Sequence, residues 1–232
     1  IPALSLKNEE ADPKSIAVLS EEEIQLLFKT TYKKPERKAS CLNDEQLLAL
    51  QARDRAMLAV YYGCGLRRNE GVCLNVGDIN FDRALVHVRK GKNYKERFVP
   101  ISKSSLKYLQ DYIYDHRPEL THGMKSEALF LGYYGKRVTG QSLLLRLKYL
   151  QHQTEDFNLT EKEIGLHTLR HSIATHLLQA GMKLEYIARF LGHGSLESTQ
   201  IYTHLAGVES DTPQEFKNVR FSKVQLHEDE LY

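Results

Sequence analysis

The stretch from residue 166 to residue 205, LHTLRHSIATHLLQAGMKLEYIARFLGHGSLESTQIYTHL, constrains the fold more than any other part of the chain. Its first half predicts a helix over Thr168–Ala180 that ends at Gly181, because glycine commonly adopts the left-handed conformation that closes a helix. A second helix is expected over Met182–Leu191, ending at the next glycine, and a short one around Tyr202. The stretch therefore predicts a series of helices joined by tight turns.

Helical patterns also dominate the residues before this stretch. Ser20 followed by Glu23 forms a capping box that opens one helix. Asn43 begins a long apolar helix that ends near Gly63 and Gly65. Further helices are expected over about 66–74, 102–116 and 139–153. The chain is thus expected to be mainly α-helical.

A small antiparallel sheet is expected in the middle of the chain. The segment ALVHV alternates apolar and polar residues, GKNY makes a turn, and RFVPI forms a second strand, so Leu85–Ile101 is expected to be a hairpin. A third short strand is expected over Ala128–Gly132. The predicted fold class is mainly α with a small antiparallel β-sheet (α+β).

Length and polarity predict one domain between two polar ends. At 232 residues the chain can bury one good-sized core, and we expect it over residues 19–206, with polar tails over 1–18 and 207–232. No apolar run approaches the roughly 20 residues that span a bilayer, and the first residues lack the pattern of a signal peptide. Cys41, Cys64 and Cys73 form no CxxC pair, which favours a reducing, cytoplasmic compartment.

Charge is distributed unevenly, although the net charge is only +2. The predicted hairpin is strongly basic, and Glu96 is the one acid between its first and last basic residues. Such a stripe suits a polyanion such as DNA, although a solvated hairpin would look the same. The basic residues from 83 to 97 are Arg83, Arg89, Lys90, Lys92, Lys95 and Arg97, of which we expect Arg89, Lys90, Lys95 and Arg97 to contact DNA.

Four polar residues near the end of the predicted domain suit the chemistry of a phosphodiester. They are His167, Arg170, His193 and Tyr202. An arginine fork can hold phosphate oxygens, and a tyrosine can attack phosphorus and store the bond energy for a later resealing step. Because an ordinary phenol has a pKa of about 10, such a tyrosine needs a base or a positive field.

A metal site is the competing interpretation of the histidines. His167 and His171 stand four apart, as a pair of ligands on a helix would. No glutamate follows the first histidine as in HExxH, Arg170 would place a permanent charge beside the cation, and His176 should point away from His167. We therefore expect no metal, and no nucleotide or other cofactor.

Two upstream motifs supply candidates for the other half of a phosphate site. In GLRRNE, Arg67 follows a glycine-rich helix end, so that its side chain can reach a pocket. In GKNYKER, at the tip of the hairpin, Lys92 and Lys95 offer ammonium groups that could deliver a proton to a leaving hydroxyl.

These motifs make the chain resemble the tyrosine recombinase, or phage integrase, family, and in particular its Xer-like and mobile-element branches. The matching segments are GLRRNE, GKNYKERFVP, HTLRHSIATHLL and LGHGSLESTQIYTHL, in this order. They cover roughly Leu19–Leu205, which is where the family has its catalytic domain. The resemblance implies the catalytic-domain fold of that family.

The resemblance also assigns the groups that would hold the phosphate. Arg67 and Arg170 would be the two clamping arginines, and His193 would hydrogen-bond a phosphate oxygen. Glu70 stands where the family often carries an acid and would support the clamp.

Proton transfer and covalent attack are assigned in the same way. Tyr202 would become the 3′-phosphotyrosine, and His167, close to the phosphate, would be a candidate proton acceptor for the phenol. Lys92 would be the general acid for the 5′-hydroxyl, with Lys90 as the second choice because the hairpin register allows either.

The activity that the resemblance implies is metal-independent, site-specific cleavage and rejoining of double-stranded DNA at a recombination site, by a synaptic tetramer of protomers and without a membrane partner. Residues 1–18 would link to a missing N-terminal DNA-clamping domain, and residues 207–232 could dock on a neighbouring subunit. A bacterial cytoplasmic or nucleoid location would follow. A type IB topoisomerase and a non-catalytic DNA-binding module of the same fold are the alternatives.

Overall fold

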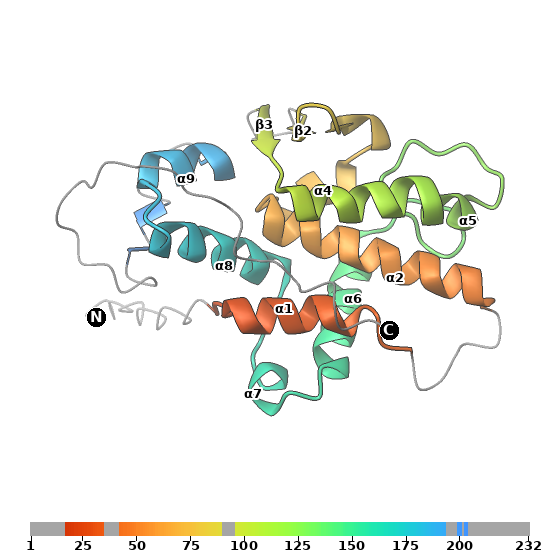
Figure 1. Cartoon of the computed structure of the whole chain (residues 1–232), viewed down its shortest axis with the longest axis horizontal. Coiled ribbons are helices and arrows are strands. Elements are labelled where there is room, and N and C mark those ends of the chain that lie inside the picture. The colour runs from red at the N-terminus through yellow and green to blue at the C-terminus, as the bar shows by residue number, and fades with distance from the viewer. Residues whose placement is uncertain (1–16, 35–41, 90–95, 194–198, 201, 204–232) are drawn as a thin grey trace, which may run out of the picture.

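The computed structural model describes residues 17–34, 42–89, 96–193, 199, 200, 202 and 203. Helices make up most of it, and a small sheet lies near the N-terminal end of α4 (Figure 1). The elements in chain order are α1 (Glu21–Thr30), α2 (Asp44–Leu58), η1 (Ala59–Gly63), α3 (Arg68–Cys73), η2 (Val76–Asp78), β1 (Ile79–Asn80), β2 (Leu85–Val88), β3 (Arg97–Pro100), α4 (Lys103–Gln110), η3 (Asp111–His116), α5 (Arg117–Thr121), α6 (Gly140–Gln153), α7 (Phe157–Thr160), α8 (Leu166–Gln179) and α9 (Leu184–Leu191). The expected fold class is confirmed.

Local capping determines where the first two long helices begin. The Ser20 hydroxyl accepts a hydrogen bond from the Glu23 amide at 3.2 Å, and the Glu23 carboxylate accepts one from the Ser20 amide at 2.8 Å. Asn43 and Gln46 form the same reciprocal pair at the start of α2. Both starts agree with the prediction, because a capping box satisfies amides that have no partner inside the helix.

The helix that begins after Ser102 is longer than the sequence predicted. It runs through α4, a π-helical stretch η3 and α5, and so continues past His116 to Thr121. Pro118 does not stop it, because it occupies the first turn of α5, where proline is tolerated. The expected end at His116 was therefore wrong.

The sheet contains three antiparallel strands in the order β1-β2-β3. The predicted hairpin is present, with Val86 paired to Val99 and Val88 to Arg97. The third strand is β1, which pairs Ile79 with Val86. The expected strand over Ala128–Gly132 was wrong, because this segment makes only isolated bridges, from Ala128 to Asn75 and from Leu131 to Arg137.

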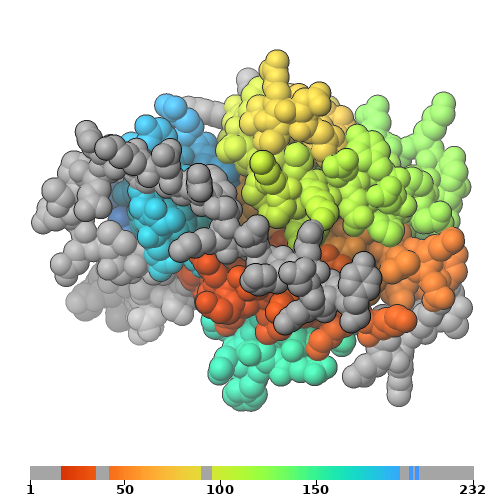
Figure 2. Space-filling view, viewed as in Figure 1, coloured from red at the N-terminus to blue at the C-terminus, as the bar shows by residue number. Residues whose placement is uncertain are grey.

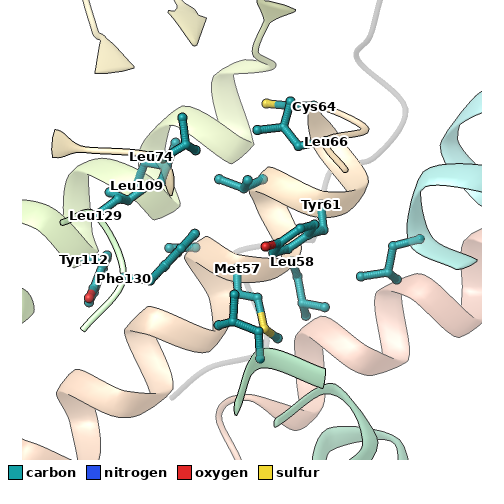
Figure 3. Packing of buried hydrophobic residues seen from close by; sticks show 14 of the residues in the cluster. Met57, Leu58, Tyr61, Cys64, Leu66, Leu74, Leu109, Tyr112, Leu129 and Phe130 are labelled. Atoms are coloured by element: carbon teal, nitrogen blue, oxygen red, sulfur yellow. The ribbon is translucent and has the colours of Figure 1, made fainter. Parts of the chain in front are cut away.

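The main hydrophobic core surrounds α2 and η1. Met57, Leu58 and Tyr61 are buried there among side chains from α4, η3 and the segment before α6, including Phe130 (Figure 3). In the space-filling view of Figure 2, the side chains of α4 and of the strands adjoin one another on the surface. This core fixes the position of α3 and of the first half of α8, which carry the candidate site.

A second, smaller cluster lies between α8 and α9. Its buried members are Ala174, Leu177, Ile187, Leu191 and Tyr202. Figure 1 shows these two helices side by side, away from α5 and the far end of α2. Within the described part of the chain, no helix combines the length and the apolar character needed to cross a membrane.

Candidate active site

The side chains of Arg67 and Arg170 meet at the last turn of α9. Arg170 donates from Nη1 to the carbonyl of Gly65 at 2.6 Å and from Nη2 to the carbonyl of Leu191 at 3.0 Å. Arg67 donates from Nη1 to the same Leu191 carbonyl at 3.4 Å and from Nη2 to that of Gly192 at 3.2 Å. The structure thus brings together the two arginines that the sequence placed in a phosphate clamp.

Glycine is required at both backbone positions that border this pair. Gly65 has a φ of +57° and Gly192 a φ of +68°, in the left-handed region that side chains rarely adopt. A Cβ atom at Gly65 would also lie 2.9 Å from the Leu191 side chain. The two turns can therefore hold their carbonyls against the arginines only with glycine in place.

Glu70 lies next to this pair and connects Arg67 to a third arginine, Arg97. Its carboxylate accepts hydrogen bonds from the amide and guanidinium of Arg67 at 2.8 and 3.1 Å, and from both terminal nitrogens of Arg97 at 2.8 and 3.0 Å. Burial alone would raise the pKa of Glu70, but its hydrogen bonds and ion pairs with Arg97 and Arg67 lower it. Glu70 therefore remains ionised and pairs with Arg67, and its support of a phosphate clamp stays a prediction.

The structure gives Arg97 an internal position, in contrast to the expected surface contact with DNA. Its side chain is only 9% exposed. Besides its contacts with Glu70, it donates a hydrogen bond from Nε to the carbonyl of Phe190 at 3.2 Å. The basic residue instead joins β3 to α3 and to the end of α9. The sequence could not reveal this, because both partners are remote along the chain.

Of the remaining basic residues of the hairpin that were expected to act on DNA, the structure describes Arg89. Arg89 is 58% exposed and pairs through Nε with Asp78 at 2.6 Å, so its charge remains at the surface. Lys90, Lys92 and Lys95 lie outside the described residues.

Tyr202 lies inside the small cluster with its hydroxyl facing α8. The side chain is 1% exposed, and its hydroxyl is 3.1 Å from Nδ1 of His171. The ring of His193 stacks on that of Tyr202 at a centroid distance of 6.3 Å, and its Nδ1 lies 2.8 Å from the Thr199 hydroxyl. A phenol with an imidazole on each side therefore lies beside the arginine pair.

Burial and positive charge determine the protonation states in this pocket. Burial raises the pKa of Tyr202, while the charges of Arg170 and Arg67 oppose the increase. Burial, together with the charges of Arg170, Arg67 and Arg97, lowers the pKa of His193 to about 4. The pKa of Arg170 falls to about 10, first through burial and then through the charge of Arg67. At neutral pH the pocket thus holds charged arginines, a neutral imidazole and an un-ionised phenol.

His167 lies at the edge of this pocket. It is exposed at the N-terminal end of α8, where its ring covers Gly165 and lies 5.9 Å from the ring of His171. The imidazole that hydrogen-bonds the Tyr202 hydroxyl is that of His171, which we did not single out for this role. The motif HTLRH contained it, but His171 was considered from the sequence only as a metal ligand paired with His167.

The histidines of the competing metal interpretation have other partners. His171 contacts Tyr202, and Nδ1 of His176 lies 2.9 Å from the Tyr62 hydroxyl. Among the residues that the structure describes, no group of three His, Cys, Asp or Glu side chains could hold a metal ion. The arrangement instead suits an anion held by guanidinium groups beside a nucleophilic hydroxyl.

A protein-family model described as "Phage integrase family" matches residues 17–208. The chain belongs to the phage integrase family. Among its family relatives, tyrosine recombinase XerC of Chlamydia trachomatis serovar L2 is 40% identical over 182 residues, which are 74% of this chain and 56% of that protein. Tyrosine recombinase XerD of Pseudomonas putida is 41% identical over 158 residues, covering 68% of this chain and 51% of that protein. The chain thus spans about half the length of these relatives.

Solved structures of the family share this fold. The crystal structure of XerA recombinase matches with a TM-score of 0.64 and 25% identity, over 81% of this chain and 60% of that one. XerH site-specific recombinase, bound to a palindromic difH substrate in a post-cleavage complex, matches with a TM-score of 0.66 and 25% identity, over 86% of this chain and 52% of that one. The helical fold with its small sheet is therefore the catalytic-domain fold of tyrosine recombinases.

Proposed function

We propose that this chain is the catalytic part of a site-specific DNA recombinase, which cleaves and rejoins DNA strands through a 3′-phosphotyrosine at Tyr202. The observation that carries the proposal is the buried hydroxyl of Tyr202 in one pocket with Arg67 and Arg170. The names of the XerC and XerD relatives support the same activity.

In the proposed reaction, the arginines hold the scissile phosphate. A guanidinium carries five N–H donors, so it can keep a backbone carbonyl and still donate to a phosphate oxygen. Arg67 and Arg170 already have fixed positions on the carbonyls of Leu191, Gly192 and Gly65, so little reorganisation is needed as charge develops on the phosphate. The neutral ring of His193 would donate a further hydrogen bond, and the exposed His167 would meet the same phosphate at the rim.

The chemical step is a transesterification. The Tyr202 hydroxyl gives its proton to a base, for which the resemblance names His167, and its oxygen attacks phosphorus. The bond from phosphorus to the 5′-oxygen breaks, and that oxygen takes a proton from Lys92, with Lys90 as the second choice. The 3′-phosphotyrosine keeps the energy of the broken bond, so a 5′-hydroxyl can later attack it and reseal a strand. No metal, nucleotide or other cofactor enters these steps.

The proposed partners are a double-stranded recombination site and further protomers that form a synaptic tetramer on it. The XerH structure, bound to its difH substrate, supports the DNA partner. We propose that the protein acts in the bacterial cytoplasm, on the nucleoid or on a mobile element. Residues 207–232 would dock on a neighbouring protomer.

The proposal is tested by trapping the covalent adduct. The chain is incubated in EDTA with labelled nicked duplexes, drawn from the flanks of its own gene and from a pool with randomised centres. We expect an SDS-resistant band that carries DNA, and we expect it to disappear in Tyr202→Phe while DNA binding persists. Tyr186→Phe, which alters an exposed tyrosine of α9, is the matched control and should keep the band. Strand transfer by Tyr202→Phe would overturn the proposal.

A further inference from the structure

A side chain of α8 lies beside the hydroxyl of Tyr202. Nδ1 of His171 lies 3.1 Å from the Tyr202 hydroxyl, within hydrogen-bonding distance, and the two ring centroids are 5.7 Å apart. His171 follows Arg170 directly, so one helix turn carries both a clamping arginine and the partner of the phenol. This short element therefore fixes the distance between the phosphate site and the group beside the nucleophile.

We propose that His171, rather than His167, accepts the proton of the Tyr202 phenol during attack on the phosphate. This inference rests on the proposed function and names one more catalytic residue for it. Neither the sequence prediction nor the resemblance gave His171 a role.

The surroundings of His171 keep its ring in the unprotonated form that a proton acceptor needs. Burial lowers the pKa of His171 to about 4, and the neighbouring His167 and Arg170 on the same helix contribute to the decrease. The ring is therefore neutral at pH 7 and can accept a proton on Nδ1. Tyr202 also lies against this ring, and His193 is near enough to interact with its charge. Arg67 shares the Leu191 carbonyl with Arg170. A bound phosphate would offset the charges of Arg67 and Arg170, and would thereby make His171 more basic at the moment of attack.

His167 is less well placed for the same task. Its ring is exposed at the start of α8 and contacts the ring of His171 edge to face at a centroid distance of 5.9 Å. Residues four apart on a helix share one face, so His167 can meet the phosphate or pass a proton onward from His171. The acceptor next to the phenol is nevertheless His171.

The proposed step moves one proton from Tyr202 and exchanges one bond at phosphorus. The Tyr202 oxygen forms a bond to phosphorus while its proton moves to Nδ1 of His171. The bond between phosphorus and the 5′-oxygen breaks, and the general acid protonates that oxygen. In the reverse step a 5′-hydroxyl attacks phosphorus and returns its proton to the general acid. The bond between phosphorus and the Tyr202 oxygen breaks, and that oxygen takes the proton back from His171.

The same helix contains a matched pair that lies outside the reaction. His176 and Tyr62 hydrogen-bond at 2.9 Å, and both side chains are partly or fully buried, as in the pair of His171 and Tyr202. Substitution of His176 should therefore show how the loss of a histidine–tyrosine hydrogen bond affects α8 when the contact of Tyr202 is unchanged.

The experiment measures single-turnover adduct formation by the whole 232-residue chain on nicked duplexes. His171→Asn keeps an acceptor near the position of Nδ1 but cannot take up a proton, and His171→Ala leaves space for added imidazole. We expect both variants to slow adduct formation by about 100-fold or more, because a positioned base contributes about 10²–10⁴-fold. His176→Asn should form the adduct at the rate of the unsubstituted chain, and thermal unfolding establishes that each variant is folded.

Two rescues separate proton transfer from mere support of the tyrosine. Imidazole in solution should restore the rate of His171→Ala. A fluorinated tyrosine at position 202, whose phenol loses its proton more easily, should speed His171→Asn more than it speeds the unsubstituted chain. Folded His171 variants with the unsubstituted rate, or a loss that neither rescue relieves, would overturn the inference. Absence of any adduct from the unsubstituted chain would count against the proposed function itself.

Discussion

The two hydrophobic clusters of this molecule support different halves of the active site. The main core packs side chains from α1 to the start of α8, and it anchors the segments that carry Arg67, Glu70 and Arg170. Among the described residues, the cluster between α8 and α9 has five buried members, and Tyr202 is one of them. The proposed phosphate clamp is therefore built into the bulk of the fold, whereas the proposed nucleophile packs in the smaller cluster.

The two regions meet at the end of α9. Phe190 packs against both clusters, and the last carbonyls of this helix accept hydrogen bonds from Arg67, Arg97 and Arg170. Positive groups at a helix C-terminus are favourable, since the helix dipole places partial negative charge there. A shift of α9 would therefore disturb the clamp and the nucleophile together.

Arg170→Lys should cause the largest loss of activity, because it weakens the arginine clamp. Lysine cannot donate a forked pair of hydrogen bonds to a phosphate, and the loss of one preorganised donor costs about 10²–10³-fold in rate. It would also leave the carbonyl of Gly65 without its bond from Nη1. Single-turnover adduct formation measures the loss, and Arg189→Lys on the exposed face of α9 is the control. Equal rates for both variants would contradict the assigned clamp.

Glu70→Gln should destabilise the region where the clamp joins the main core. Its carboxylate is 3% exposed and pairs with Arg97, and the breaking of a buried ion pair costs about 3–5 kcal/mol in the free energy of unfolding. Chemical denaturation measures this loss. Glu161→Gln, at an exposed position after α7, should change the stability little.

Glu70 also predicts how stability depends on pH. Because its pKa is lower in the folded protein than in the unfolded chain, the ionised carboxylate stabilises the fold above the unfolded pKa of about 4.3. This contribution disappears as the pH falls through the folded pKa. Glu70→Gln should therefore flatten the loss of stability on acidification, and an unchanged pH profile would contradict the buried ion pair.

A pair of cavity variants should separate the two clusters. Leu109→Ala, in the main core, should lower the free energy of unfolding by about 3 kcal/mol while the folded fraction keeps its rate of adduct formation. Ile187→Ala, in the small cluster, should cost less global stability, but it should allow the side chains packed around Tyr202 to separate locally. A local cost of about 1.4 kcal/mol corresponds to a tenfold loss of the closed state. If Leu109→Ala slowed adduct formation and Ile187→Ala lowered only the free energy of unfolding, this division between the two clusters would be contradicted.

The smallest effect is expected from Arg89. Because its side chain is 58% exposed, Arg89→Ala should reduce the salt dependence of DNA binding by a slope of about 0.9, the value for one phosphate contact. Arg97→Ala should leave the slope unchanged and lower the stability instead, since this side chain is buried against Glu70. Binding isotherms at several salt concentrations measure both, and a lower slope for Arg97→Ala alone would reverse the assignment.

Local signals explain why much of the fold could be predicted from the sequence. The caps at Ser20 and Asn43, and the left-handed glycine Gly192, act within a few residues of their own positions. The strand β1 is only two residues long, too short for a repeating pattern, and its pairing depends on β2. The π-helical stretch η3 similarly depends on packing and leaves no simple sequence signal.

Residue types explain how much of the candidate site could be predicted. Arg67 and Arg170 were expected in a phosphate clamp because of their chemistry and motifs, and Glu70 was added only through the family resemblance. The roles of Arg97 and His171 depend on partners from other elements, namely Glu70 and Tyr202. A basic residue in a basic hairpin favours a surface position, and only the approach of α3 makes Arg97 internal.

The most direct test of the site is the identity of the residue that carries DNA. The adduct formed on a nicked duplex is trimmed with nuclease, digested with protease and sequenced by mass spectrometry. We predict that the nucleotide mass lies on Tyr202, joined through a 3′-phosphate. A nucleotide on any other residue, or a 5′-phosphate linkage, would contradict the proposed active site.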